Sequence, residues 1–331
     1  MRLTTPATAA RDRATFAPPA VKRDGNLRME AAWIDPALLR TFDAEGTDAH
    51  RLCTIADGWV ERFGSDTLIS FKNIATRDRL FCELNFWGTI VGFSLGRVFG
   101  RLLPKRHEQR EKPRLISGGR KANLQTTVRE RHLKFGIDFG AGYSVGLFVD
   151  QRENRTYVRK VKPKRLLNCF AYTCSFSVAA ASVGASTVNV DLSKKSLGRG
   201  RANFALNRLA TIGHQFIVDD VISILPRLAR RGEKFDAIIL DPPTFSRNWR
   251  GNSFQVENDF EKLLARALEV AARDAHILLS TNCSALGQHA LERMARHSLK
   301  LSRRAGKFAR PAPLPDFPPG AGAESVWLSL R

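Results

Sequence analysis

Short apolar runs alternate with helical patterns through the second half of the chain. Runs typical of strands cover residues 165–170, 186–190, 215–218, 235–240 and 275–280, and helical patterns cover 176–183, 192–208, 221–229 and 254–272. Unbroken apolar runs are typical of parallel strands that are covered on both faces. The alternation therefore predicts an α/β fold with a doubly wound sheet. A last strand, at residues 325–329, is expected on an edge of this sheet.

Acidic residues follow three successive predicted strands. They are Asp191 after the second strand, Asp219 and Asp220 after the third, and Asp241 after the fourth. In open α/β sheets ligands bind outside the carboxyl ends of the strands, and an acid about 20 residues after the first turn meets ribose hydroxyls. A nucleotide-like ligand is therefore expected at this edge. Each acid has a local alternative, because Asp is favoured as a helix N-cap after a strand.

A stiff turn follows the strand at residues 235–240. Asp241 is followed by Pro242 and Pro243, and Phe245 comes two residues later. Each proline fixes its own φ and favours an extended predecessor. A carboxylate beside an aromatic ring is suited to holding a planar heterocycle for chemistry. An ordinary Asp-Pro turn is the alternative, since short motifs also match by chance.

The turn after the first strand contains no glycine. Residues 171–175 read Ala-Tyr-Thr-Cys-Ser, where a dinucleotide site would show a glycine-rich loop. Because a pyrophosphate needs close backbone approach, NAD and FAD are disfavoured. S-adenosylmethionine has no pyrophosphate and is compatible with this turn. The glycine-rich segment at 138–146 is expected to form a hairpin turn, since apolar residues follow it without an intervening helix.

The chain carries a strong positive charge. It has 53 Lys and Arg against 32 Asp and Glu, a formal net charge of +21 and a pI near 10.5. Such a bias favours a polyanionic partner such as RNA, with binding that weakens as salt rises. The basic residues cluster within 105–121, 159–165 and 227–231. A single cluster is more often a solvated surface, and arginine content also follows genomic base composition.

Length and the remaining composition indicate how many domains to expect and which other classes of protein are excluded. We expect a mobile segment over residues 1–26, a small α+β domain over 27–129 and the sheet domain over 130–331. The five cysteines include no C-x-x-C pair, so neither a metal site nor a disulfide framework is expected. No membrane span is expected, because Arg97 and Arg101 interrupt the most apolar segment. No secretory segment is evident, so a bacterial cytoplasmic location is the default, with an organellar transit peptide as the alternative for the start of the chain.

A set of motifs occurs here in a known order. They lie at residues 146–155, 167–173, 190–193, 203–207, 219–221 and 241–245, with weaker matches at 47–52 and 57–64. Together they resemble the bacterial family of S-adenosylmethionine-dependent methyltransferases that includes the large-subunit ribosomal RNA cytosine-C5 methyltransferases. The resemblance implies a mostly parallel, seven-stranded class I methyltransferase sheet, S-adenosylmethionine as cofactor and RNA as substrate. The chain departs from the pattern at Cys174 and Ser175, where the family has glycines, and shows no RNA-binding PUA domain.

The resemblance also implies roles for individual residues. Asp191 would hold the ribose and Asp220 the adenine amine, with Asp219 as the adjacent candidate. Other cofactor contacts would come from Asn168, Phe170, Ala171, Tyr172, Thr173, Leu192, Val221 and Asp241, with Asp241 near the transferable methyl group. The substrate side would include Gln151, Arg152, Pro242, Pro243 and Phe245.

The atom that receives the methyl group depends on Cys283, which follows the last parallel strand. Methylation of a pyrimidine at C5 requires a nucleophile at C6, and a thiolate is the usual one. Cys283 stands where the C5 family keeps its thiol, although Asn282 departs from the family's small neighbour. A buried cysteine that only fills space is the alternative. Transfer to a ring or exocyclic nitrogen of a base would then apply. The missing glycines at Cys174 and Ser175 leave a further alternative, an RNA-binding module on a decayed methyltransferase fold.

Overall fold

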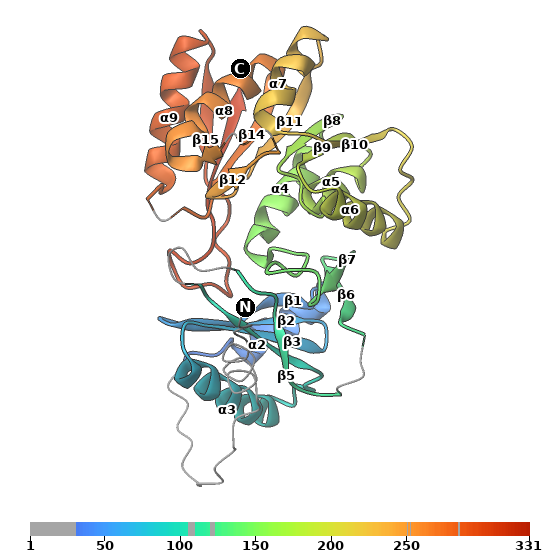
Figure 1. The fold of residues 1–331 in the computed structure, drawn as a ribbon, viewed down its shortest axis with the longest axis vertical. Coiled ribbons are helices and arrows are strands. Elements are labelled where there is room, and N and C mark those ends of the chain that lie inside the picture. The colour runs from blue at the N-terminus through green and yellow to red at the C-terminus, as the bar shows by residue number, and fades with distance from the viewer. Residues whose placement is uncertain (1–30, 105–109, 120–122, 250, 252, 284) are drawn as a thin grey trace, which may run out of the picture. The chain divides into compact units, whose positions relative to one another are not determined.

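The computed structural model describes residues 31–331 except 105–109, 120–122, 250, 252 and 284 (Figure 1). The segment expected to be mobile, residues 1–26, lies outside the described residues, as does part of the first basic cluster. By its contacts the described part of the chain divides into two compact units, the first from residue 31 to 149 with 315–318 and the second over 150–314 with 319–331. The contacts thus change after Val149, whereas the sequence places the domain boundary near Glu130. Residues 125–138 belong to the first unit, because they form a hairpin that contacts its sheet.

A five-stranded sheet forms the centre of the first unit. Its strands are β1 (Ala49–Ile55), β2 (Gly58–Phe63), β3 (Asp66–Phe71), β4 (Val98–Leu102) and β5 (Arg114–Ser117), in that order. The helices α2 (Pro36–Ala44) and α3 (Ile74–Val91) add Phe42 and Leu80 to its core, and β6 (Gln125–Glu130) pairs with β7 (Leu133–Asp138). Within the described residues, no helix combines the length and the apolar character needed to cross a membrane.

The second unit is built on a seven-stranded sheet. Its elements are η1 (Val149–Gln151), α4 (Arg152–Val161), β8 (Arg165–Cys169), α5 (Ser175–Ala181), β9 (Ser186–Asp191), α6 (Lys194–Leu206), β10 (His214–Val218), α7 (Val221–Arg230), β11 (Phe235–Leu240), β12 (Phe245–Arg247), β13 (Ser253–Gln255), α8 (Val256–Val270), β14 (Ala271–Thr281), α9 (Gln288–Leu301), β15 (Gly306–Ala309) and β16 (Glu324–Leu330). The strand order is β10-β9-β8-β11-β14-β16-β15, and the first five strands are parallel. The predicted α/β fold, with its mostly parallel seven-stranded sheet and a smaller N-terminal α+β domain, is confirmed.

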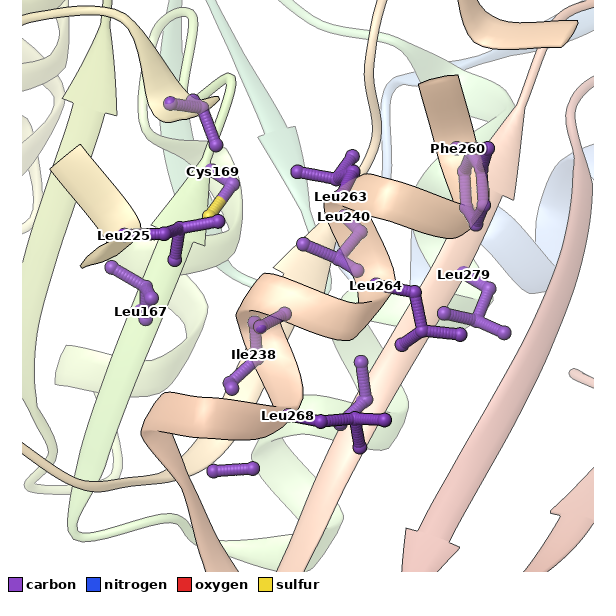
Figure 2. Packing of buried hydrophobic residues seen from close by; sticks show 14 of the residues in the cluster. Leu167, Cys169, Leu225, Ile238, Leu240, Phe260, Leu263, Leu264, Leu268 and Leu279 are labelled. Carbon is purple, nitrogen blue, oxygen red and sulfur yellow. The ribbon is translucent and has the colours of Figure 1, made fainter. Parts of the chain in front are cut away.

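Helices cover both faces of this sheet, which explains the unbroken apolar runs. Leu167, Ile238 and Leu240 pack on the side of α7, α8 and α9, and Figure 2 shows α8 residues such as Leu263 and Leu264 beside them. The alternate positions, such as Leu166 and Ile239, belong to a second cluster with α4 and α5. Because successive side chains of a strand point to opposite faces, both sets of positions must be apolar here.

Two expectations from the sequence are wrong. The strand at residues 325–329 is not an edge strand, because β16 pairs with β14 on one side and β15 on the other, and Trp327 is fully buried between helix and sheet. The edge is β15, whose short Gly306–Ala309 pattern gave no strand signal. The segment 138–146 is not a hairpin turn: Asp138 N–H donates to the carbonyl of Val145 at 2.8 Å, but no strand follows before η1.

Candidate functional site

Five parallel strands deliver their carboxyl ends to one edge of the sheet. The register pairs Cys169 with Val190 and with Leu240, and pairs Val218 with Asp191. The segments that follow these strands therefore begin at the same level. They are the turn at 170–174, Asp191 with Leu192, Asp219 with Asp220, Asp241 with its prolines, and residues 282–283 after β14. The structure thus brings the predicted acids and Cys283 to one edge of the second unit.

The Asp191 carboxylate connects the first turn to the second. One oxygen accepts the backbone N–H of Tyr172 and the other accepts that of Ser193, both at 2.8 Å. Helix α6 is capped by Ser193 instead, whose hydroxyl accepts the N–H of Ser196. Burial raises the pKa of Asp191, while its two backbone hydrogen bonds lower it. The local N-cap alternative therefore does not account for Asp191.

Local capping does account for Asp220. Its carboxylate accepts both the N–H and the hydroxyl of Ser223, which makes it the N-cap of α7. Asp219 accepts the N–H of Asp220 and forms an ion pair with Arg227 at 2.6 Å. A pocket of about 510 Å³ opens beside Asp220, between the start of α7, the β12–β13 hairpin and α8. Its lining includes Ser223, Phe254 and Lys262. Asp220 thus caps a helix and borders a pocket of ligand size.

The glycine-free turn has an unusual backbone. Phe170, Tyr172 and Cys174 have φ of 57°, 46° and 58°, in the left-handed region that favours glycine. The turn is held by hydrogen bonds from Ala171 N–H to the Val190 carbonyl, from Cys174 N–H to the Ala171 carbonyl, and from the Asn203 amide to the Thr173 carbonyl. Cys174 thus adopts the conformation that explains a glycine at this position in the resembled family. No sequence signal marked these left-handed positions, because none carries a glycine or asparagine.

A glycine in α6 makes room for the Cys174 side chain. A Cβ added at Gly200 would lie 2.4 Å from Cys174 Sγ, well inside van der Waals contact. Cys174 is fully buried, and burial raises the pKa of its thiol. The two positions are therefore complementary: a side chain at one requires its absence at the other.

Asp241 lies in a polar cluster formed by η1, α4 and the strand ends. The Ser280 hydroxyl hydrogen-bonds to its carboxylate, and the charges of Asp150 and Arg155 act on it. Burial raises the pKa of Asp241 to about 6, an effect to which Asp150 adds and which Ser280 and Arg155 oppose. Arg155 is itself buried, with its guanidinium near the Ser175 hydroxyl. Sequence reasoning missed Asp150, Arg155 and Ser280, although the first two lie within the motif at 146–155.

The predicted substrate residues of that motif are buried. Gln151 donates to the Ser280 hydroxyl at 2.8 Å and accepts from the Asn154 amide, which places it in the support of Asp241. Arg152 is fully buried beside Glu153, with 3.7 Å between Arg152 Nε and Glu153 Oε1. Their contact with substrate stays a prediction. By contrast, Phe245 is 54% exposed, and Pro243 is exposed while Pro242 is buried.

Several predicted cofactor residues serve the core in this structure. Asn168 is buried and donates to the Ser177 hydroxyl at 2.9 Å, which joins β8 to α5. Val221 belongs to the main hydrophobic cluster, and Ala171 and Thr173 are also buried. Leu192 keeps partial exposure. Cofactor contacts by these residues stay predictions.

Cys283 has a carboxylate as its partner. Its thiol donates to Glu257 of α8 at 3.1 Å, and its backbone N–H donates to the Thr281 hydroxyl. The residue is 5% exposed and joins the main hydrophobic cluster. Burial, followed by the hydrogen bond that the thiol donates to Glu257, raises the pKa of the thiol. The resting group is therefore a thiol with a proton acceptor next to it. Glu257 carried no signal in the sequence, because it is distant from Cys283 along the chain.

Comparison with known proteins gives a consistent picture. A family model described as S-adenosylmethionine-dependent methyltransferase matches residues 94–329. The protein named ribosomal RNA large subunit methyltransferase I of Aeromonas salmonicida is 37% identical over 166 residues, which cover 50% of this chain and 41% of that protein. Its counterpart of the same name in Enterobacter sp. is 35% identical over 161 residues, 48% of this chain and 40% of that protein. The chain therefore spans about two fifths of the length of these relatives.

Solved structures match over more of the chain. The crystal structure of SMU.776 in complex with SAH superposes with a TM-score of 0.76 at 25% identity, and covers 89% of this chain and 79% of that chain. The S-adenosylmethionine-dependent methyltransferase structure from Agrobacterium tumefaciens has a TM-score of 0.66 at 20% identity, with coverage of 86% and 90%. The second match supports the fold alone.

The contact between Gly200 and Cys174 makes a prediction about stability. Gly200→Ala should destabilise the protein by roughly 1–3 kcal/mol, because the new Cβ overlaps Cys174 Sγ. Cys174→Gly in the same chain should restore most of the loss. Gly198→Ala is the matched control, since its Cβ meets nothing within 4 Å in the same helix; it should be neutral or stabilise by up to about 1 kcal/mol. Urea unfolding measures all three variants beside wild type, and equal effects at positions 198 and 200 would contradict the contact.

The raised pKa of Asp241 predicts a pH-dependent stability. Its pKa in the folded protein, about 6, lies above the value near 3.9 of an unfolded chain. Between these values the folded state holds the proton longer, so this carboxyl lowers stability progressively as the pH rises towards 6. Asp241→Asn should therefore gain roughly 1–3 kcal/mol relative to wild type between pH 4 and pH 7, as measured by urea unfolding. A difference that does not vary with pH would contradict the raised pKa.

Proposed function

The chain belongs to the family of S-adenosylmethionine-dependent methyltransferases, and we propose that it methylates a base of structured ribosomal RNA, with S-adenosylmethionine held at the carboxyl edge of the second unit. The observation that carries the cofactor half is the Asp191 carboxylate, which lies at this edge and is not required to cap its helix. A carboxylate at this point in a βαβ unit is placed for ribose hydroxyls.

The residues at the edge fit this cofactor. Asp191 would accept from the ribose, the left-handed turn at 170–174 would follow the methionine moiety, and Asp220 with its neighbouring pocket would meet the adenine. A site held by carboxylates suits a ligand that carries hydroxyls, an amine and a positive charge but no phosphate. When bound, S-adenosylmethionine supplies an electrophilic methyl group. Cys174 has the left-handed backbone that a glycine adopts readily. The replacement of the family's glycine by Cys174 is therefore no argument for a decayed, non-catalytic fold.

RNA as the substrate rests on charge and on the relatives. The formal net charge of +21 favours a polyanion. Relatives named ribosomal RNA large subunit methyltransferase I match half of the chain. Ribosomal RNA as substrate would place the protein in the bacterial cytoplasm, as the sequence predicts.

We further propose cytosine C5 as the acceptor atom, with Cys283 as the nucleophile. Glu257 would take the thiol proton across the 3.1 Å hydrogen bond, and the Cys283 thiolate would then add to C6 of the base. The electron pair of the C5–C6 double bond becomes available at C5 for the methyl group. Asp241, more basic than an ordinary aspartate, would remove the C5 proton, after which the sulfur–carbon bond breaks and the thiolate and the double bond are restored.

One observation favours a second acceptor. Cys283 is only 5% exposed and its pKa is raised, as expected for a cysteine that fills space. Asp241 and the proline turn that follows it would then position a base for direct transfer to a ring or exocyclic nitrogen, without a covalent intermediate.

Cofactor binding is tested by a pair of matched carboxylates. Asp191→Ala should abolish S-adenosylmethionine binding in calorimetry, because the ribose ligand and the tie to the turn are both lost. Asp236→Ala is the control: Asp236 likewise accepts two backbone N–H groups, from Lys164 and Arg165, but at the opposite end of the strands. Both variants should lose stability, and only the first should lose binding. Unchanged affinity in Asp191→Ala would refute the assignment.

The hydrogen bond between Cys283 and Glu257 leads to two predictions for one variant, a faster alkylation of the thiol and a slower methyl transfer. Glu257→Gln removes the negative charge that raises the thiol pKa and leaves only a neutral amide as hydrogen-bond partner, so alkylation of Cys283 by iodoacetamide at neutral pH should become faster. Methyl transfer to ribosomal RNA should fall by roughly 10²–10⁴-fold, because the thiol loses its proton acceptor. Trapping with RNA that contains 5-fluorocytosine should give a covalent adduct in wild type and none in Cys283→Ala. Full turnover by Cys283→Ala would establish the nitrogen alternative.

A further inference from the structure

The hairpin that follows the Asp241 turn exposes two large aromatic side chains. Strand β12, labelled in Figure 1, begins at Phe245. It pairs with β13 in an antiparallel hairpin. Phe245 is 54% exposed and Trp249 is 62% exposed, and both are among the most exposed large apolar side chains described. All five tryptophans lie in described ranges, and Trp249 alone of them is exposed to this degree. Exposed apolar surface of this kind marks an interaction site when it is clustered.

The hairpin has an inner and an outer face. Ser246 pairs with Phe254, which is 6% exposed and belongs to the main hydrophobic cluster, so these positions face α7 and α8. Phe245 and Arg247 occupy the alternate positions and are exposed, as their partners Gln255 and Ser253 are. Since alternate residues of a strand share a face, Phe245 and Arg247 lie together on the outer side. Phe254 anchors the hairpin, and so the fold does not need the rings at 245 and 249.

The chemistry of the outer face fits nucleobases. It offers the exposed Phe245 ring beside the Arg247 guanidinium, and Trp249, which is 62% exposed, follows two residues later in the connection between the strands. Residues 244–255 contain no acid. Bases stack on aromatic and guanidinium planes, whereas bases inside an A-form duplex are covered by their neighbours. The hairpin begins two residues after the rigid prolines that follow Asp241, at the ligand edge of the sheet.

We propose that Phe245, Arg247 and Trp249 form a stacking platform for unpaired RNA nucleotides that flank the target base. This inference rests on the proposed function, since it assumes an RNA substrate, and deepens it by specifying a single-stranded target region. Arg247 would pair with a phosphate or stack beside the rings, and the target base would be held at Asp241.

The test compares side chains that differ in their aromatic faces. Fluorescence anisotropy with a labelled oligocytidine strand, and with the duplex it forms with its complement, measures binding without cofactor or turnover. Phe245→Leu and Trp249→Leu keep apolar bulk but remove the ring, and each should weaken single-strand binding by roughly 5- to 100-fold. Phe245→Tyr and Trp249→Phe should bind like wild type. Ile212→Leu, at a 91% exposed position outside the hairpin, is the control and should also bind like wild type.

Two further readouts separate this inference from the proposed function. Oligocytidine should quench the tryptophan fluorescence of wild type more than that of Trp249→Phe, and duplex RNA should quench wild type less than oligocytidine does. S-adenosylmethionine binding in calorimetry should be the same in all these variants. Leu variants that bind the single strand like wild type, or wild type that prefers the duplex, would overturn the platform, even where cofactor binding and methyl transfer are intact. Loss of cofactor binding by wild type would instead refute the proposed function.

Discussion

The Asp191 carboxylate accepts the backbone N–H groups of Tyr172 and Ser193, and the geometry of the ligand edge depends on these two contacts. They hold a turn in which three residues without glycine's freedom have left-handed backbone, at a cost of about 1–2 kcal/mol each. Hydrogen bonds to a charged acceptor are stronger than neutral ones and offset part of this cost. The same carboxylate is proposed to bind ribose, so the residue that holds the turn would also contact the ligand.

A second constraint is the partly buried acid Asp241 at the centre of the edge. Ser280 and Arg155 stabilise the charged form of Asp241 and so offset part of the effect of its burial. Gln151 in turn donates a hydrogen bond to the Ser280 hydroxyl. Helix α4 is thereby linked to the ends of β11 and β14. Within the motif at residues 146–155, Asp150 and Arg155 act on the charge of Asp241 and Gln151 donates to its partner Ser280, which keeps a carboxyl of raised pKa beside the place where chemistry is proposed.

The sequence predicted most elements of the sheet domain but could not separate residues with the same local pattern. Asp191 and Asp220 each follow a strand and precede a helix, yet only Asp220 caps its helix, because Ser193 takes that role in the other case. Cys283 could be placed on the edge from its strand, but its partner Glu257 comes from α8 and leaves no mark in the sequence. The sequence predicted an edge strand at residues 325–329, because no local pattern shows that β15 pairs with the outer side of this strand.

By itself the sequence determined the alternation of strands and helices, the parallel class of the sheet and the edge at which the acids gather. These follow from hydrophobic periodicity and from the order of elements along the chain, which are local properties. Only the tertiary structure decided which acid is free of capping, how Gly200 admits the Cys174 side chain and why Asp241 holds its proton to higher pH. Those depend on groups far apart in the chain, whose distances and burial are set when the helices pack on the sheet.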